Sequence, residues 1–98
     1  MAKESQFQHN LIQEIRSRYP GAIVLKNDSS YLQGIQDLSI FWNDHYALLE
    51  CKRSINEHFQ PNQEYYIDHV NKMGGFSRMI CPENREEVLD ELQQAFGL

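Results

Sequence analysis

Two short apolar runs near the middle of the chain limit the folds that are open to it. Residues 38–42 and 46–51 are separated by a polar stretch, residues 43–45, with turn chemistry, so the runs predict two strands joined by a short turn. Side chains alternate along a strand, which places Glu50 and Lys52 on the same face of the second one. An acid and a lysine on an apolar strand resist burial unless they are paired or bound to a metal.

A second carboxylate is expected close to this pair. Asp37 opens the first of the two strands, about where a hairpin partner faces Glu50. Two carboxylates and the ammonium group of Lys52 then converge at one end of a sheet. Hard cations such as Mg²⁺ take oxygen ligands of this kind, so the pattern predicts a divalent-metal site with Asp37 and Glu50 as ligands.

The rest of the chain alternates between amphipathic stretches and short apolar runs. Helices are predicted over residues 3–18, 61–73 and 83–96, and two more strands over residues 22–26 and 76–81. The expected order is α-β-β-β-α-β-α, an α/β (α+β) fold with a central sheet flanked by helices and a further C-terminal helix. Its 98 residues are enough for one domain, residues 1–98, with one modest core.

Two polar side chains fall on the apolar stripes of the predicted helices. Glu4 projects near the middle of the first stripe, formed by Phe7, Leu11, Ile12 and Ile15. A carboxylate on a buried face is informative, although an acid this close to a helix N-terminus is also favourable when solvated. Gln63 lies on the inward stripe of the second helix with a set of larger residues, namely Tyr66, Ile67, Val70 and Met73.

Composition and charge narrow the classes of function. The net charge of −5 argues mildly against a nucleic-acid partner, but the segment from Pro82 onward carries −4 of it, which leaves room for a local basic surface elsewhere. No apolar run approaches the roughly 18 residues of a membrane span, and no signal peptide is expected. Cys51 and Cys81 lie in apolar runs without metal-site spacing, which is typical of reduced core thiols in a cytoplasmic protein.

The combined pattern resembles a known group of enzymes. Gly34-x-x-Asp37, Glu50-x-Lys52 and Gln63 in the next helix are similar to the motifs of the PD-(D/E)XK nuclease superfamily. Within it, the likeness is to the small phage proteins of the VRR-NUC group and to Holliday-junction resolvases. It extends over most of the chain and implies a restriction-endonuclease-like αβββαβ core with a mixed sheet. One departure is Gln36, which stands where the family often has a proline.

The resemblance implies a role for each matching residue. Asp37 and Glu50 would hold Mg²⁺ or Mn²⁺, with the main-chain carbonyl of Cys51 as a further ligand, and Glu4 would complete the acidic cluster directly or through water. Lys52 would orient or deprotonate the attacking water and offset charge on the phosphate. A nearby cation favours loss of the lysine proton, which suits this role. Gln63 would position Lys52, the water or the nucleic-acid backbone.

Further residues are candidates for contact with nucleic acid. Lys26 and Arg53 lie close in sequence to the expected site and suit phosphate contacts. The polar loop residues Ser29, Ser30 and Tyr31 are candidates to grip phosphates or to flank a branch point. Of the aromatic pair Tyr65 and Tyr66, one is expected in the core and the other at the surface, where it can stack on a base.

The sequence therefore favours a divalent-metal-dependent endonuclease that hydrolyses DNA, with branched DNA such as Holliday junctions as one candidate substrate. Paired cuts by so small a chain require a homodimer, and the resemblance suggests a phage protein acting in the host cytoplasm. One alternative is a non-catalytic nucleic-acid-binding or regulatory module that keeps the nuclease fold. Another is a small structural protein in which Glu50 and Lys52 form a surface ion pair.

Overall fold

The structure is a computed structural model that describes residues 2–98, with side chains described from Ser5 onward. The predicted element order is confirmed. The elements are α1 (Ala2–Arg18), β1 (Ile23–Lys26), β2 (Leu38–Trp42), β3 (His45–Cys51), α2 (Gln63–Lys72), β4 (Phe76–Ile80) and α3 (Arg85–Ala95).

The four strands form one mixed sheet in the order β1-β2-β3-β4. β2 pairs with both β1 and β3 in antiparallel fashion, and β4 runs parallel to β3. The β2–β3 register pairs Leu38 with Leu49 and Trp42 with His45, so the predicted hairpin forms with a turn at residues 43–44. Asn43 has φ 55° there, the left-handed conformation that asparagine tolerates in tight turns.

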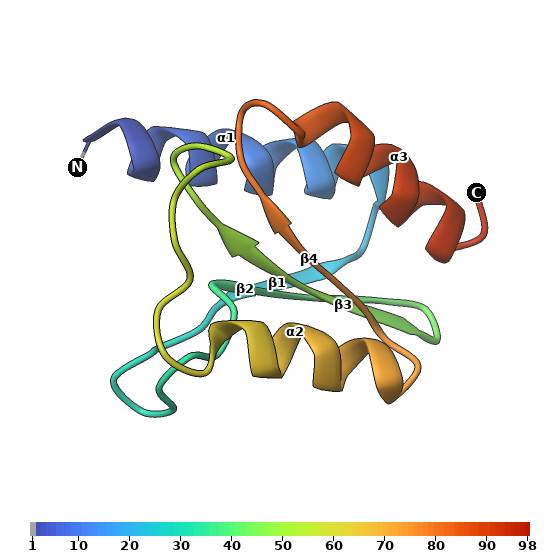
Figure 1. Ribbon diagram of the computed structural model, residues 1–98. Coiled ribbons are helices and arrows are strands. Elements are labelled where there is room, and N and C mark those ends of the chain that lie inside the picture. Colours follow the sequence, from blue (N-terminus) through green and yellow to red (C-terminus); the bar gives the residue numbers. More distant parts are fainter. Residues whose placement is uncertain (1) are drawn as a thin grey trace.

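The helices cover the sheet on both sides. α1 and α3 lie on one face and α2 lies on the other (Figure 1). The apolar core fills the space between the sheet and the α1/α3 layer, because alternate strand residues point to that side. Its buried members are Leu11, Ile12, Ile15 and Tyr19 of the first helix and its end, Leu38, Ile40, Ala47, Leu49, Cys51, Phe76 and Ile80 of the strands, and Val88, Leu89, Leu92 and Phe96 of the last helix.

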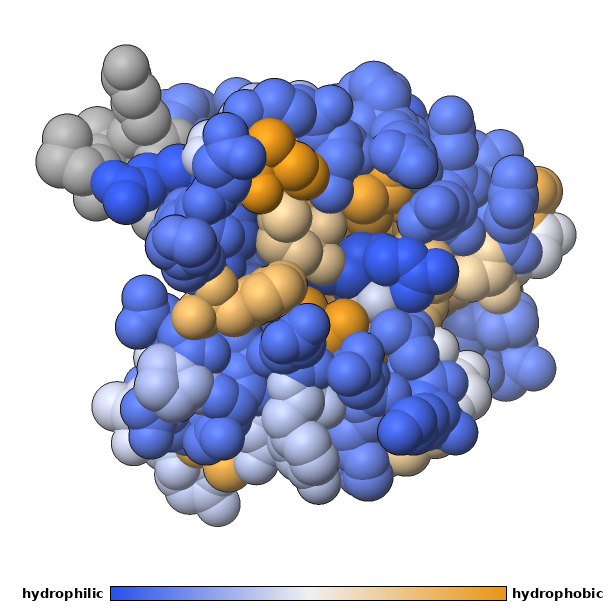
Figure 2. Space-filling view, in the orientation of Figure 1, coloured by the Kyte–Doolittle hydropathy of each residue, from blue (hydrophilic) through white to orange (hydrophobic). Residues whose placement is uncertain are grey.

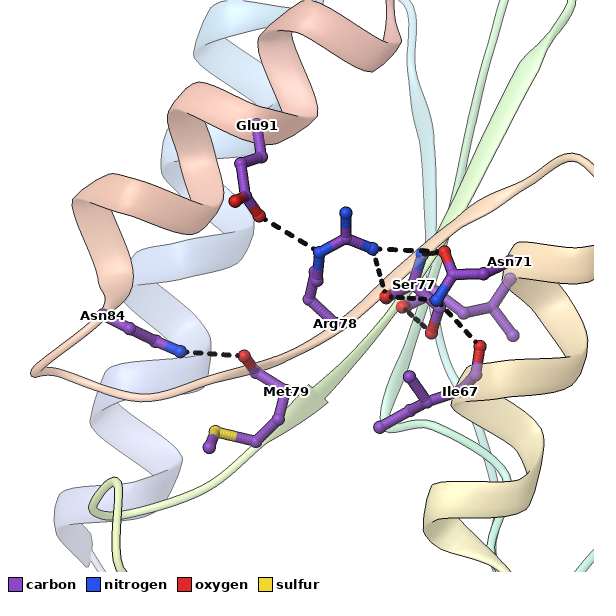
Figure 3. A network of polar contacts seen from close by, with 8 residues as sticks. Ile67, Asn71, Ser77, Arg78, Met79, Asn84 and Glu91 are labelled. Carbon is purple, nitrogen blue, oxygen red and sulfur yellow. Dashed lines mark hydrogen bonds and ion pairs between the residues drawn. The ribbon is translucent and has the colours of Figure 1, made fainter.

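The face toward α2 is more polar than the core face. Asn71 of α2 makes two bonds to the backbone of Ser77 in β4, donating to its carbonyl at 2.9 Å and accepting from its N–H at 2.8 Å. The Arg78 guanidinium donates to Asn71 and to Glu91 of α3, so it links the two helix layers across β4 (Figure 3). Within α2 itself, Val70 is the one buried residue. Hydrogen bonds as well as apolar contact therefore hold α2 to the sheet.

The surface in the same orientation is mostly hydrophilic. Orange and tan residues gather in the middle of this face, between the α1/α3 layer and α2, and blue residues surround them (Figure 2). Within residues 2–98, no helix has both the length and the apolar character needed to cross a lipid bilayer.

The structure corrects the expected position of Met73 and shows the surroundings of Trp42 and the two cysteines. Met73 was expected on the buried stripe of the second helix, but α2 ends at Lys72 and Met73 is 59% exposed, because it caps the helix just before Gly74 turns the chain away. Trp42 packs against Tyr19 and Phe96, with ring centroids 5.2 and 5.9 Å away, and its Nε1–H donates to the Pro20 carbonyl. Cys51 and Cys81 are both buried and unbridged, as expected.

Candidate active site

Asp37 and Glu50 come together where β2 begins and β3 ends. The strand register places them opposite each other, one step beyond the Leu38–Leu49 pair. The Cys51 N–H donates to Asp37 Oδ2 at 2.8 Å, which ties the start of one strand to the end of the other. The Glu50 carboxyl also lies close enough to Asp37 to act on its pKa. The expected convergence of these two carboxylates is therefore present.

The electrostatics of the pair reflect its partial burial. Burial raises the pKa of Asp37 above its usual range, and the nearby Glu57 carboxylate acts in the same direction. The hydrogen bond from the Cys51 N–H, the contact with Glu50 and the charge of Lys52 oppose this rise in pKa but do not cancel it. Without a cation, Asp37 therefore keeps a proton to higher pH than an isolated aspartate does.

Lys52 lies directly beside Glu50 and is as deeply buried. Each residue is 3% exposed, and Lys52 Nζ lies 3.8 Å from Glu50 Oε2. The main-chain N–H of Lys52 donates to the Ile80 carbonyl at 2.9 Å, which continues the β3–β4 ladder past the end of β3. The ammonium group also lies 5.7 Å from the centroid of the Phe59 ring. A lysine this buried requires such partners.

Gln63 connects the acid and the lysine. Its Oε1 accepts from Lys52 Nζ at 2.8 Å, while its Nε2 donates to Glu50 Oε2 at 2.9 Å. The same Oε1 also accepts from the Gln60 main-chain N–H at 2.7 Å, which anchors the amide to the loop before α2. Gln63 is the first residue of α2, so the helix start positions this amide over the end of β3. The predicted inward orientation of Gln63 is thus found.

Gly34 explains how two separate loops meet at this site. It has φ +92°, and a Cβ built on it would lie 2.5 Å from Asn62 Cβ and 2.8 Å from the Pro61 carbonyl oxygen. Gly34 precedes Asp37 by three residues, and Asn62 directly precedes Gln63. A residue without a side chain at position 34 therefore lets the backbone of the Asp37 loop pack against the start of α2.

The structure describes only one of the two remaining predicted metal ligands in full. Cys51 ends β3 beside the Asp37 carboxylate, and ligation by its carbonyl stays a prediction. Glu4 belongs to α1, but its side chain lies outside the described residues. Among the side chains that are described, from Ser5 to Leu98, no group of three or more His, Cys, Asp or Glu is arranged to hold a metal ion.

The donor chemistry nevertheless fits a hard divalent cation. Asp37 and Glu50 supply carboxylate oxygens from neighbouring strands on one face of the sheet. Mg²⁺ typically takes one or two carboxylates and keeps several waters, so a pair of this kind meets its minimum requirement. A cation bound between Asp37 and Glu50 would also offset the repulsion between their carboxylates, to which Lys52 is the nearby basic residue.

The residues predicted to contact nucleic acid are spread around the site. Lys26 at the end of β1, Ser30 in the next loop and Arg53 after β3 are all exposed. Ser30 bonds through its N–H and hydroxyl to Asp28, and Arg53 pairs with a carboxylate of its own loop. Tyr66, the tyrosine named as a candidate for nucleic-acid contact, is half-buried, and its ring meets the more exposed Tyr65 edge-on at 5.1 Å. Neither tyrosine belongs to the buried core, where one of them was expected.

Sequence reasoning missed two residues of the loop between β3 and α2. Glu57 Oε1 accepts from the Arg53 main-chain N–H at 2.7 Å, and its charge acts on both Asp37 and Lys52. Phe59 contributes the ring beside the Lys52 ammonium. Neither belongs to a helix or strand with a periodic pattern. An apolar phenylalanine just before Gln60-Pro61 in a polar loop was the available signal.

Comparisons with known proteins found no similar protein. A scan against protein-family models, a search of curated proteins and a search of solved structures each found no match to the chain. The geometry of Asp37, Glu50, Lys52 and Gln63 is thus the basis for assigning a function.

Proposed function

We propose that the protein is a divalent-metal-dependent endonuclease that hydrolyses phosphodiester bonds in DNA. The observation that supports this most is the Gln63 amide, which bonds Lys52 and Glu50 at once, next to a second carboxylate from Asp37. The pKa of Asp37 is raised, and perturbed pKa values cluster at functional sites. A hydrolytic site uses all four groups.

Asp37 and Glu50 would hold the cation, which supplies Lewis acidity and a more acidic bound water. The Lys52 side chain lies beside Glu50, where it can offset charge on the phosphate or orient the attacking water. Gln63 restricts the ammonium group by accepting its hydrogen bond while its own N–H is fixed on Glu50. The Gln60 N–H fixes the amide in turn. Each residue thus holds the next in one orientation.

The direct test is cleavage of supercoiled, linear and four-way-junction DNA with Mg²⁺ or Mn²⁺. We expect nicking by the wild type and none by Asp37→Asn, which keeps the side-chain shape and an acceptor for the Cys51 N–H. Asp44→Asn is the matched control, because Asp44 is exposed in the turn at the other end of the same hairpin. If the wild type cuts none of these substrates, or if Asp37→Asn cuts as fast as Asp44→Asn, the proposal is wrong.

We further propose a homodimer for paired cuts. One site cuts one strand, and a two-fold pair of sites suits a symmetric junction. Light scattering at assay concentration measures the mass directly. A monomer that still makes paired incisions would contradict the dimer and leave the nuclease proposal in place.

A second candidate is a non-catalytic nucleic-acid-binding module, and the burial of the charged groups favours it. Glu50 and Lys52 are each 3% exposed, as also occurs in internal ion pairs that take no part in catalysis. Calorimetric titration with Mn²⁺ separates the two candidates. Binding that disappears in Asp37→Asn supports the nuclease, and the absence of any binding by the wild type supports the module.

A further inference from the structure

The loop between β1 and β2 forms an open hollow on the surface near the start of β2. It is lined by Asn27, Asp28, Tyr31, Leu32 and Ile35 and has a volume of about 460 Å³. That volume falls in the usual range for small-ligand pockets. Tyr31 is 90% exposed and Leu32 is 39% exposed, so the apolar lining faces solvent rather than the core.

Internal hydrogen bonds fix the shape of this hollow. The N–H groups of Tyr31 and Leu32 both donate to the Asp28 carbonyl, and the Ile35 N–H donates to the Leu32 carbonyl. The Asn27 amide donates to the Gln36 carbonyl at 2.9 Å and thereby ties the two ends of the loop together. The loop backbone is therefore held in place while the tyrosine ring stays uncovered.

The hollow adjoins Asp37 directly. The main-chain N–H of Asn27, one of its lining residues, donates to the Asp37 carbonyl at 2.8 Å. The hollow is thus linked through Asn27 to the main chain of Asp37, a proposed metal ligand. Lys26, which precedes Asn27, offers a positive charge for the connecting phosphate.

The chemistry of the lining points to a base rather than a phosphate. Tyr31, Leu32 and Ile35 form an apolar wall of the kind that the flat face of a base stacks on. The Asp28 carboxylate at the edge repels phosphate but accepts hydrogen bonds from an amino group. Hydrogen bonds from the Ser30 hydroxyl and N–H lower the pKa of Asp28, so it remains an acceptor at neutral pH.

We propose that this hollow binds one unpaired nucleobase of the DNA strand that is cut, with preference for bases that carry an exocyclic amino group. The proposal rests on the proposed nuclease function and names its substrate class. Bases in an intact duplex are stacked and paired and do not enter such a site, whereas flaps, gaps, loops and open junctions offer unpaired ones. With a chain of net charge −5, stacking then carries a large share of the affinity.

Fluorescence anisotropy in the presence of EDTA tests base binding separately from cleavage. A short fluorescein-labelled single strand of mixed sequence should bind at least about tenfold more tightly than the same strand in a blunt duplex. Tyr31→Ala should remove about tenfold of the single-strand affinity, and Tyr31→Phe should restore it. Because Tyr31 is 90% exposed, its truncation leaves the fold intact. Phe41→Ala, an exposed ring on β2 outside the hollow, is the matched control and should bind as the wild type does.

The amino-group preference has its own comparison. The wild type should bind oligodeoxycytidine more tightly than oligodeoxythymidine, which lacks the exocyclic amino group, and Asp28→Asn should reduce this difference. Equal affinity for single strand and duplex, or a Tyr31→Ala variant that binds single strands like the wild type, would overturn the base site. Cleavage without any Tyr31 effect would refute this site and keep the nuclease. Base binding by a protein that never cuts DNA would keep the base site and refute the nuclease.

Discussion

Replacing Gly34 with alanine should destabilise the protein more than replacing another glycine with the same backbone conformation. Gly34 and Gly74 have φ +92° and +98°, but only the added Cβ at position 34 meets neighbouring atoms; around Gly74 nothing lies within 4 Å. Both substitutions therefore share the backbone term of a left-handed alanine, about 1–2 kcal/mol. They also share the loss of glycine's freedom in the unfolded chain, which cancels in the comparison.

The contact term belongs to Gly34→Ala alone. The new methyl group would lie 2.5 Å from Asn62 Cβ and 2.7 Å from the Asn62 carbonyl carbon, and backbone atoms cannot rotate away as a side-chain tip can. Overpacking of this kind typically costs about 1–3 kcal/mol, so we expect a total loss of about 2–5 kcal/mol for Gly34→Ala. A domain of this size has about 5–15 kcal/mol of stability, which keeps the variant measurable.

Urea denaturation of the wild type, Gly34→Ala and Gly74→Ala, followed by circular dichroism, gives the three free energies of unfolding. A difference between the two variants below about 0.5 kcal/mol would show that Gly34 and Asn62 are not in close contact in solution. Because Asn62 leads directly into Gln63, the Gly34→Ala variant should also lose DNA cleavage under conditions where it is still folded. The Gly74→Ala variant should keep cleavage.

Three further substitutions probe other contacts. Gln63→Leu removes all three side-chain hydrogen bonds of the amide and leaves the buried acid and lysine poorly paired, so we expect a loss of about 1–3 kcal/mol by urea denaturation together with loss of cleavage. Glu14 has its pKa lowered by the hydrogen bond from Arg18, so its stabilisation is present above the usual carboxylate pKa and is lost as pH falls through the lowered value. Glu14→Gln should therefore lower the free energy of unfolding by no more than about 1 kcal/mol at neutral pH, seen as a slightly lower melting temperature. In strong acid it should change neither. Trp42→Phe removes the hydrogen bond to the Pro20 carbonyl while keeping an aromatic ring in the cluster, and it should cost about 0.5–1.5 kcal/mol by thermal denaturation.

Each of these expectations has a contrary result. A Gln63→Leu protein that is as stable and active as the wild type would mean that the amide does not organise the site. A Glu14→Gln difference that grows toward acid pH would reverse the assigned sign. An unchanged melting temperature in Trp42→Phe would mean that water replaces the indole N–H as the donor to the Pro20 carbonyl at no cost.

The parts of the fold that repeat with a period were predictable from the sequence. The hairpin of β2 and β3 follows from alternation and a polar turn, and it fixes Asp37 opposite Glu50 with no further information. The helical stripes gave the buried residues of α1 and α3 and the inward position of Gln63. These features depend on local geometry, which each short stretch of sequence encodes by itself.

What the sequence did not reveal depends on contacts between loops. The role of Gly34 is visible only once the β1–β2 loop is seen against Asn62, and Glu57 and Phe59 reach the site through an irregular loop. Met73 was misplaced because the helix stops one residue earlier than its stripe suggests. Loop packing is set by the whole fold, and no periodic signal reports it.

The two helix layers differ in how polar their contacts with the sheet are, and this difference affects which helix opens most readily. α1 and α3 pack against one side of the sheet through apolar side chains, whereas α2 has one buried residue and is held in part by hydrogen bonds such as those between Asn71 and Ser77. Water competes well for such links, so amide protons of α2 should exchange with deuterium before those of the other two helices. Gln63 begins this more weakly fastened helix. The sheet would then form the rigid part of the proposed site, and α2 the part that can move when a substrate binds.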